Sequence, residues 1–497
     1  MNTDISVPKV EEEGSAQQSQ NYTYKWLAIS VAAGVFVWLL PTPEALGPNG
    51  HAFLALLVTI VLLWTSEALP IGVTALLVGS GMVIFNIQPT ARAWQPYTSP
   101  AVVFVFFIIM LGVMLGQTTI PNRIMAGILK LGGKNVMRLS FTLCMGSTFM
   151  AAWTHDATIT IILLYAIMPM FLKMGLTPDK SNNFTKHFMF MIPLAAACGG
   201  GATFLGSGRS PVSAEMLGVI TGYHIGFMEY AIYQFVPSLF LGLATFIAVW
   251  IIYPPKVKVL PAELAVEKLP PMTRNEKILA ALLIVTFGMW FFTDLTKIHV
   301  SAIGGLFVVA CIMFNVVSWK QCLADYPWNP IMVFGAGFSL GIAMLDTGAG
   351  EWLASQIFPI FTNAPWPLVA AGASWISAVI TSFMANAAAT SLLVPVMVPM
   401  ADMAGTPVVP IAMSVPLATT FVLFVIGCPP TLIAYGFGYF TQWEAFKVFL
   451  FRSIVGIAVL TIAMALWYPL VGMPGNIDNM TTPAKLTITG YELTVPQ

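Results

Sequence analysis

The sequence FMAAWTHDATITIILLY (149–165) decides the fold, because two apolar arms meet in it at the polar tripeptide THD (154–156). The sequence FMANAAATSLLVP (383–395) has the same form and breaks at ANA (385–387). Hydrocarbon cannot solvate backbone N–H and C=O groups, so a helix is interrupted at membrane depth only where protein or a cavity surrounds the break. The two segments therefore predict two hairpins that enclose a site inside a membrane.

The composition indicates a membrane protein along its whole length. Of the 497 residues, 58% are hydrophobic and only 8% are charged, whereas soluble domains carry about 25% charged residues. The formal net charge is zero, which gives no indication of a nucleic-acid partner. The five cysteines are scattered without metal-ligand spacing, so no cofactor is predicted.

Apolar stretches of about 20 residues, long enough to cross the hydrocarbon core, recur along the chain. Eleven are expected, near 25–41, 51–68, 70–87, 100–117, 187–218, 227–253, 277–293, 299–317, 329–347, 407–440 and 447–471. The segments 139–174 and 367–402 are each two arms around a break, and the arms of the first look short for a full crossing. The predicted fold is an all-α polytopic membrane protein with about 11 transmembrane helices and two re-entrant hairpins, in two inverted-topology repeats.

The same pattern divides the chain into five parts. A polar segment at 1–24 has no basic start of the kind found in a secretory signal, so it is expected to be a disordered cytoplasmic tail. The first repeat covers 25–253, a charged cytoplasmic linker 254–276, the second repeat 277–472 and a C-terminal tail 473–497.

The distribution of Lys and Arg agrees with a cytoplasmic N-terminus. In this layout 17 of the 21 basic residues are cytoplasmic, Arg92, Lys297 and Lys485 are outside, and Arg209 lies within the membrane. Full double crossings at the hairpins would give the same split, so the re-entrant prediction depends on arm length. The cytoplasmic set comprises Lys9, Lys25, Arg123, Lys130, Lys134, Arg138, Lys173, Lys180, Lys186, Lys256, Lys258, Lys268, Arg274, Lys277, Lys320, Lys447 and Arg452.

The two halves of the chain resemble each other weakly. LGVML (111–115) matches LGIAM (340–344), the two hairpin breaks match, and GSGRSP (206–211) matches GCPPT (427–431). The offsets are 229, 231 and 221 residues. Paired Gly/Pro breaks in inverted repeats mark the substrate site of many secondary transporters. Gly and Pro are also common in membrane helices, but four breaks at matched positions favour a site.

Several motifs carry a family resemblance, namely WTSEALP (64–70), FGAGFSLG (334–341), both hairpins and GCPPTLIAYGFG (427–438). The chain resembles the divalent-anion:sodium symporter family, which includes bacterial dicarboxylate and citrate carriers, from about residue 25 to 472. The resemblance implies an alternating-access transporter of small organic anions in the cell inner membrane, forming a homodimer within the lipid bilayer.

The chain departs from the family's most specific motif, a Ser-Asn-Thr at each hairpin tip that supplies sodium ligands and substrate contacts. Thr154-His155-Asp156 and Ala385-Asn386-Ala387 replace it, so Asn386 and the Thr154 hydroxyl are retained. Arg209 stands in a loop that is usually neutral, and Thr431 stands where the family usually has Asn. Because of these departures, sodium coupling and a plain dicarboxylate substrate do not follow from the resemblance.

Asp156 and Arg209 are the clearest charges at membrane depth, where charges are costly and usually functional. A guanidinium suits a carboxylate or sulfonate, whereas Asp156 could instead cap the second hairpin arm. Histidine is the residue type suited to proton transfer, so His155 is included as a site candidate, with a packing role as the alternative. The predicted substrate site comprises Thr154, His155, Asp156, Gly208, Arg209, Ser210, Asn386, Ala387, Pro429, Pro430 and Thr431.

The coupling ion is expected at Thr154, Asp156 and Asn386, either as a proton on Asp156 or as sodium near Thr154 and Asn386. The leading hypothesis is a transporter of di- or tricarboxylates or sulfonates, with an anion exchanger as the alternative. A membrane-embedded enzyme would need a catalytic motif such as HExxH, which the sequence lacks. A non-transporting membrane subunit would not need matched breaks or buried charges.

Overall fold

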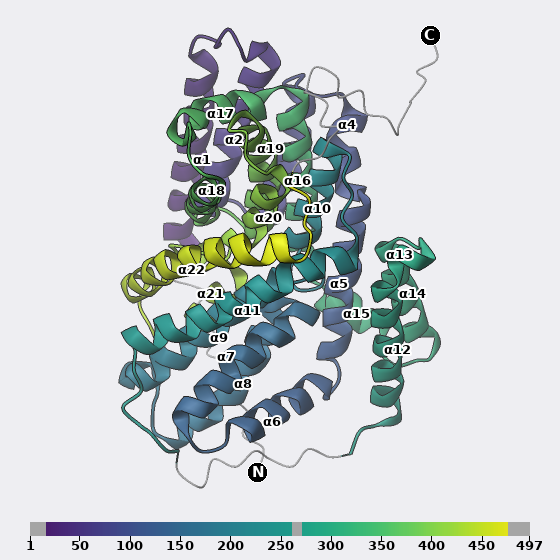
Figure 1. The fold of residues 1–497 in the computed structure, drawn as a ribbon, viewed down its shortest axis with the longest axis vertical. Coiled ribbons are helices and arrows are strands. Elements are labelled where there is room, and N and C mark those ends of the chain that lie inside the picture. The colour runs from purple at the N-terminus through teal and green to yellow at the C-terminus, as the bar shows by residue number, and fades with distance from the viewer. Residues whose placement is uncertain (1–15, 261–270, 476–497) are drawn as a thin grey trace.

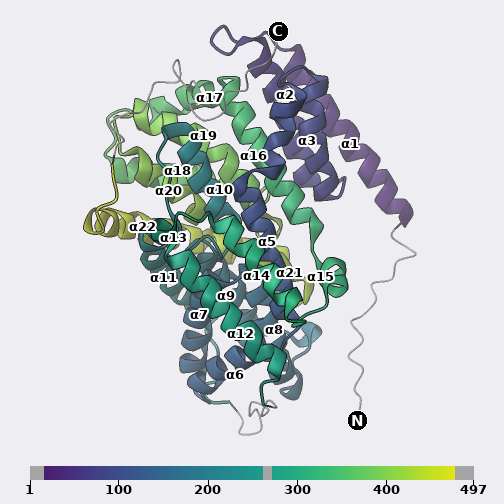
Figure 2. The same ribbon diagram turned by 90° about the vertical axis from the view of Figure 1, so that its right-hand side faces the viewer.

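The computed structural model describes residues 16–260 and 271–475, and its regular elements there are helices. Figures 1 and 2 show an elongated bundle that the first helix leaves at a slant. Lys9, Lys268 and Lys485 lie outside the described residues, as do most of both predicted tails and part of the linker.

Eleven helices make up the first half of the chain. Hairpin α7–α8 is followed by the broken pair α9–α10, whose two pieces are separated by residues 201–208. The bounds are α1 (Ala16–Leu39), α2 (Gly47–Ser66), α3 (Ile71–Ile84), α4 (Thr90–Trp94), α5 (Pro100–Gly116), α6 (Ile120–Gly132), α7 (Val136–Trp153), α8 (Asp156–Lys173), α9 (Asn183–Gly200), α10 (Arg209–Thr221) and α11 (Phe227–Ile252).

The second half repeats this order, with hairpin α18–α19 followed by the broken pair α20–α21. Residues 419–428 separate the two pieces of that pair. The bounds are α12 (Arg274–Phe291), α13 (Thr293–Thr296), α14 (Val300–Met313), α15 (Trp319–Asp325), α16 (Trp328–Asp346), α17 (Ala349–Ile357), α18 (Trp366–Thr381), α19 (Asn386–Met403), α20 (Val408–Ala418), α21 (Pro429–Gly436) and α22 (Gln442–Leu470).

The length and the surface of the helices suit a bilayer. In the described residues seven segments are long and apolar enough to cross a membrane, and four further apolar helices are shorter. Large apolar side chains such as Leu306, Met313 and Leu466 are exposed on these helices, where lipid would cover them. The protein is an all-helical, multi-span membrane protein, as predicted. The seven segments are Tyr22–Leu39, Gly47–Ser66, Thr90–Gly116, Asp156–Lys173, Phe227–Ile252, Trp328–Asp346 and Gln442–Leu470.

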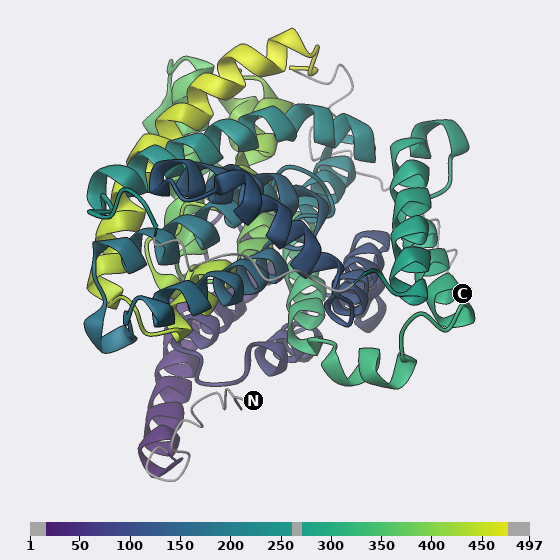
Figure 3. The same ribbon diagram turned by 90° about the horizontal axis from the view of Figure 1, so that it is seen from below.

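The broken pairs lie at the centre of the bundle. In Figure 1, α11 and the long α22 cross the middle of the molecule beside α9 and α7, and α10 lies beside α19 and α20 above them. Seen from below, α12 and α14 stand at one edge of this body (Figure 3). Residues 184–200 of α9 and the loop 201–208 are almost all buried, so protein encloses the first break, whereas Phe424 in the second break is exposed.

Several sequence predictions need correction. The stretches 187–218 and 407–440 are not continuous spans, because α9–α10 and α20–α21 break inside them. The amphipathic α6 and the short α15 and α17 were not predicted, and α1 begins at Ala16, inside the segment expected to be disordered. Hairpin helices α7 and α8 have 18 residues each, about 27 Å, so they are longer than expected and arm length does not distinguish a re-entrant hairpin from a crossing.

Candidate functional site

The tip of the first hairpin is held by the break between α9 and α10. Thr154 is extended, with φ −143° and ψ 159°, and His155 is the N-cap of α8. The backbone N–H of Asp156 donates to the carbonyl of Gly206 at 2.9 Å, and the Thr203 hydroxyl donates to the carbonyl of Ala152. The loop 201–208 therefore satisfies backbone groups that the turn between α7 and α8 leaves open.

Asp156 lies in the first turn of α8, next to the N-cap His155, and faces a cation. Its side chain is 2% exposed, and its Oδ1 accepts from the backbone N–H of Ala157 at 2.7 Å. Its Oδ2 lies 3.8 Å from Nη2 of Arg209. The Nδ1 atom of His155 lies 3.4 Å from Oδ1 of Asp156 and accepts from the Ala157 N–H at 3.3 Å. The carboxylate of Asp156 thus interacts both with a backbone N–H in the first turn of α8 and with the guanidinium of Arg209.

Arg209 is the first residue of α10 and is 0% exposed. Its Nη2 donates to the carbonyl of Ala197 in α9 at 2.6 Å. Its buried Nε has no hydrogen-bond partner within the described ranges, so the guanidinium keeps a donor available for a further acceptor.

Asn386 brings the second hairpin to the same guanidinium. We assign its amide from its partners: the nitrogen donates to the hydroxyl of Thr381 at 2.8 Å and to the carbonyls of Gly427 at 2.6 Å and Thr419 at 3.1 Å. In this orientation its oxygen accepts from Nη1 of Arg209 at 2.6 Å. Arg209 therefore contacts Asn386 at the second tip and lies beside Asp156 at the first.

Gly200 allows the side chains of Asp156 and Arg209 to lie close together. A Cβ atom at Gly200 would lie 2.5 Å from Oδ2 of Asp156 and 2.9 Å from Nη2 of Arg209. A larger residue would push the two charged groups apart. The last residue of α9 thus sets the space in which the ion pair fits.

The other predicted site residues fall into two groups. Gly208 and Ser210 flank Arg209, and the ring of Phe334 in α16 packs on the Cα of Gly208. The second break is held by Thr431, whose hydroxyl donates to the carbonyl of Cys428 at 2.7 Å. Ala387 and Pro430 are buried nearby, whereas Pro429 is exposed.

Thr154 points away from the Arg209 cluster. Its hydroxyl donates to the carbonyl of Met150 at 2.9 Å. It also lines a small apolar cavity of about 30 Å³ formed by residues of α5 to α8. A sodium ion shared by Thr154 and Asn386 stays a prediction.

Arg452 is a buried cation that sequence reasoning placed wrongly in the cytoplasm. It is 1% exposed and lies within α22. It donates to the carbonyl of Thr420 at 2.6 Å, the Sγ atom of Cys198 at 2.9 Å and the hydroxyl of Thr245 at 3.0 Å. The position of Arg452 inside the predicted span 447–471 was the sequence feature that could have indicated its burial.

The two buried arginines lie close together. Arg209 contacts Ala197 and Arg452 contacts the next residue, Cys198. On the other side, Asn386 contacts Thr419 and Arg452 contacts the next residue, Thr420. Both guanidiniums are therefore anchored to the same turn of α9. Arg452 also contacts the start of the second break directly, and Arg209 is linked to it through Asn386.

A family model describing the sodium:sulfate symporter transmembrane region matches residues 21–473. The chain belongs to the sodium:sulfate symporter family. It is therefore a secondary transporter and not an enzyme, and the resemblance drawn from the sequence motifs is confirmed.

Relatives of this chain include named transporters. It is 24% identical over 402 residues to "Dicarboxylate transporter 1, chloroplastic" of Spinacia oleracea, covering 75% of this chain and 70% of that protein. It is 26% identical to an uncharacterized transporter of Haemophilus influenzae, covering 84% of this chain and 92% of that protein.

Solved structures of other transporters share the fold. The YdaH transporter of Alcanivorax borkumensis gives a TM-score of 0.54 at 13% identity, covering 93% of this chain and 99% of that one. MtrF of Neisseria gonorrhoeae gives 0.51 at 12% identity, covering 89% of this chain and 94% of that one.

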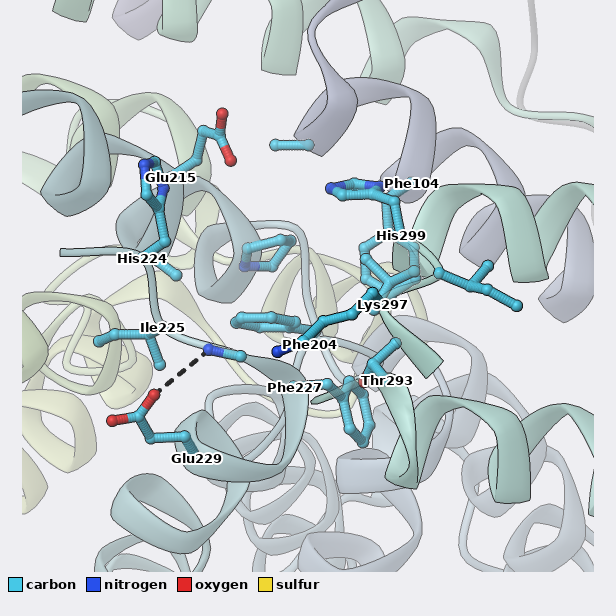
Figure 4. Close-up of a pocket in the computed structure, with 16 residues that line it drawn as sticks. Phe104, Phe204, Glu215, His224, Ile225, Phe227, Glu229, Thr293, Lys297 and His299 are labelled. Atoms are coloured by element: carbon cyan, nitrogen blue, oxygen red, sulfur yellow. Dashed lines mark hydrogen bonds between the residues drawn. The ribbon is translucent and has the colours of Figure 1, made fainter. Parts of the chain in front are cut away.

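The transporter also contains a cavity of about 440 Å³ (Figure 4), and Arg209 is not among the described residues that line it. It lies between α10–α11 and the α13–α14 corner, and five titratable residues line it, namely Glu215, His224, Glu229, Lys297 and His299. Within the described ranges no group of three or more His, Cys, Asp or Glu side chains is arranged to hold a metal ion.

Proposed function

We propose that this protein transports small organic anions, of the di- or tricarboxylate or sulfonate type, by alternating access around Asp156, Arg209 and Asn386. The observation that carries the proposal is the guanidinium of Arg209, which is fully buried, contacts Asn386 at one hairpin tip and lies 3.8 Å from Asp156 at the other. A buried guanidinium is suited to bidentate recognition of a carboxylate or sulfonate.

The balance of buried charge favours an anion. Arg209 and Arg452 bring two positive charges to the breaks, and Asp156 brings one negative charge. A net positive charge in a low-dielectric interior is costly unless it is paired, and a substrate anion would supply the pairing. The name of the Spinacia oleracea relative, a dicarboxylate transporter, agrees with this substrate class.

The ion pair also suggests how substrate and cation are coupled. While the site is empty, Asp156 balances Arg209. When a substrate carboxylate takes Arg209, the Asp156 carboxylate loses its partner and requires a cation, either a proton or sodium. We favour the proton slightly, because an imidazole and a carboxylate replace the neutral family motif at this tip, and sodium is the close alternative.

The same arrangement favours symport over obligatory exchange. An empty carrier in which Asp156 already neutralises Arg209 has no uncompensated charge on that arginine when it reorients. An obligatory exchanger needs the empty carrier to be unable to return. Anion exchange of the same fold is therefore the second candidate.

The proposed membrane arrangement follows the sequence pattern. The N-terminus is placed in the cytoplasm, α7–α8 and α18–α19 are re-entrant hairpins of two inverted repeats, and the protein is a homodimer in the cell inner membrane. The matched order of hairpin and broken pair in the two halves supports the repeat.

Uptake into proteoliposomes tests the function. Purified protein is reconstituted, and uptake of labelled succinate, malate, citrate and an alkyl sulfonate is measured with the sodium and proton gradients imposed separately. We expect accumulation of at least one dianion driven by one of the gradients. Absence of uptake for all four, with a monodisperse protein that binds none of them, would contradict the proposal.

A further inference from the structure

The cavity in Figure 4 has two walls from distant parts of the chain. One wall comes from α10 and the start of α11, and the other from the turn between α13 and α14. Its floor is formed by Phe104, Phe204 and Phe227, which pack on one another with ring centroids 5.8 and 6.3 Å apart. The cavity therefore joins a polar rim to an aromatic floor.

The two walls carry opposite charges. Glu215 and His224 lie together on the α10 side, and Lys297 reaches into the cavity from the opposite side (Figure 4). Within the described part of the chain neither Glu215 nor Lys297 forms an ion pair. A carboxylate and an ammonium thus face one cavity without contacting each other.

The second acidic residue, Glu229, is already occupied. Its Oε1 accepts from the hydroxyl of Tyr233 at 2.8 Å and also from the hydroxyl of Tyr223, and its Oε2 accepts from the N–H of Gly226 at 3.4 Å. Glu215 is therefore the carboxylate that remains for a ligand.

The backbone fixes the groups around the rim. Lys297 has φ +55°, a left-handed conformation that a non-glycine residue adopts at some cost. His299 accepts through Nδ1 from the N–H of Ser301 at 3.2 Å, which leaves its proton on Nε2. The ring of His224 lies over Gly218, where a Cβ atom would come within 2.5 Å of Nδ1.

From these contacts we infer that the cavity binds a small zwitterion with an apolar body, such as an aromatic amino acid. Its carboxylate contacts Lys297 and the Nε2–H of His299, its ammonium contacts Glu215, and its side chain lies over the three phenylalanine rings. A simple anion would leave Glu215 beside a like charge, and a simple cation would do the same to Lys297. The inference is independent of the proposed dianion transport.

Binding of tritiated L-phenylalanine to the full chain in nanodiscs tests the site. We expect saturable binding that 3-phenylpropionate and phenethylamine displace about tenfold less well than unlabelled phenylalanine, because each lacks one of the two charges. Lys297→Gln should remove the preference over phenethylamine, and Glu215→Gln should remove the preference over 3-phenylpropionate.

Two controls separate this site from its surroundings. Lys320→Gln, on the exposed surface of α15, should bind phenylalanine as the wild type does. Saturating succinate should leave phenylalanine binding to the wild type unchanged, and competition between the two would place the ligand in the transport site and overturn the inference. Absence of saturable binding in the millimolar range, or unchanged preferences in both cavity variants, would overturn it as well.

Discussion

Nη1 of Arg209 donates to Oδ1 of Asn386 at 2.6 Å, and this contact joins the broken helix of the first half to the hairpin of the second. On its other side the same guanidinium lies 3.8 Å from Asp156. The two halves of the transporter are therefore linked through one cation, and a ligand that takes that cation must alter contacts at both hairpin tips.

Arg209→Lys is expected to weaken substrate binding strongly. Lysine keeps the charge but has neither the planar fork nor the reach to hold Asn386, Ala197 and a substrate carboxylate together. Loss of one charge-assisted hydrogen bond costs about 1.5–3 kcal/mol, so the KM for uptake should rise about 10- to 100-fold. An unchanged apparent affinity in proteoliposomes would exclude Arg209 from the substrate site.

Asp156→Asn tests coupling. If Asp156 carries the proton, the variant loses accumulation driven by the proton gradient but still exchanges internal for external substrate, because Asn cannot load and release a proton. The measurement is counterflow beside net uptake. Normal accumulation by the variant, with wild-type uptake that follows sodium regardless of pH, would leave Asp156 as a helix cap.

Gly200→Ala is expected to disrupt the ion pair without changing any charge. The new methyl group would lie 2.5 Å from Oδ2 of Asp156, and such overpacking costs about 1–3 kcal/mol. A lowered melting temperature in detergent and reduced uptake should follow. Gly288→Ala is the matched control, because nothing lies within 4 Å of a Cβ atom there. Equal behaviour of the two variants would contradict the role given to Gly200.

The breaks and their charges could be predicted because hydrocarbon penalises both. An interrupted helix and an ionised side chain at membrane depth each need enclosure, so THD (154–156), Arg209 and Asn386 stood out in the sequence. In the structure Asp156, Arg209 and Asn386 lie together, and their role in a substrate site stays a prediction. The direction of the Thr154 hydroxyl was not predictable, since it depends on which helices pack around the tip.

Arg452 was misplaced because the helix that carries it begins earlier than the sequence predicts. The predicted span began at 447, which puts an arginine near its end, where the side chain could reach the interface. In the structure α22 begins at Gln442, so Arg452 lies deeper, among α9, α11 and the second break. The cavity at Glu215 and Lys297 needed tertiary structure, because its walls are about 80 residues apart in the chain.

The contacts of Glu276 at the start of α12 predict that the stability of the folded protein depends on pH. It accepts from the N–H of Thr119 at 2.8 Å, the hydroxyl of Thr119 at 2.5 Å and the N–H of Thr273 at 2.8 Å. These bonds, led by the one from the Thr119 hydroxyl, lower the pKa of Glu276 from 4.5 to about 2. Because the pKa of Glu276 is lower in the folded state, its ionised side chain stabilises the folded state at pH values above the ordinary pKa of 4.5. That stabilisation is lost as the pH falls from 4.5 toward 2.

The melting temperature of Glu276→Gln should therefore lie below that of the wild type at pH 7, and the gap should narrow between pH 4.5 and the lowest pH at which the protein stays soluble. Glu44→Gln, at an exposed position, is the control and should show no gap. A difference in melting temperature between Glu276→Gln and the wild type that stays constant with pH would contradict the lowered pKa of Glu276.

Arg452 is expected to set the preference for dianions over monoanions. At a separation on the order of 10 Å and an effective dielectric constant near 20, one buried charge contributes about 1.7 kcal/mol per substrate charge. Removing it in Arg452→Met should therefore lower the ratio of dianion to monoanion affinity about 20-fold, measured with succinate and butyrate. Arg452→Lys should keep the ratio, and Arg138→Met, exposed before the first hairpin, is the surface control. A purely structural arginine would weaken both substrates in proportion, so an unchanged ratio in Arg452→Met would exclude the electrostatic role.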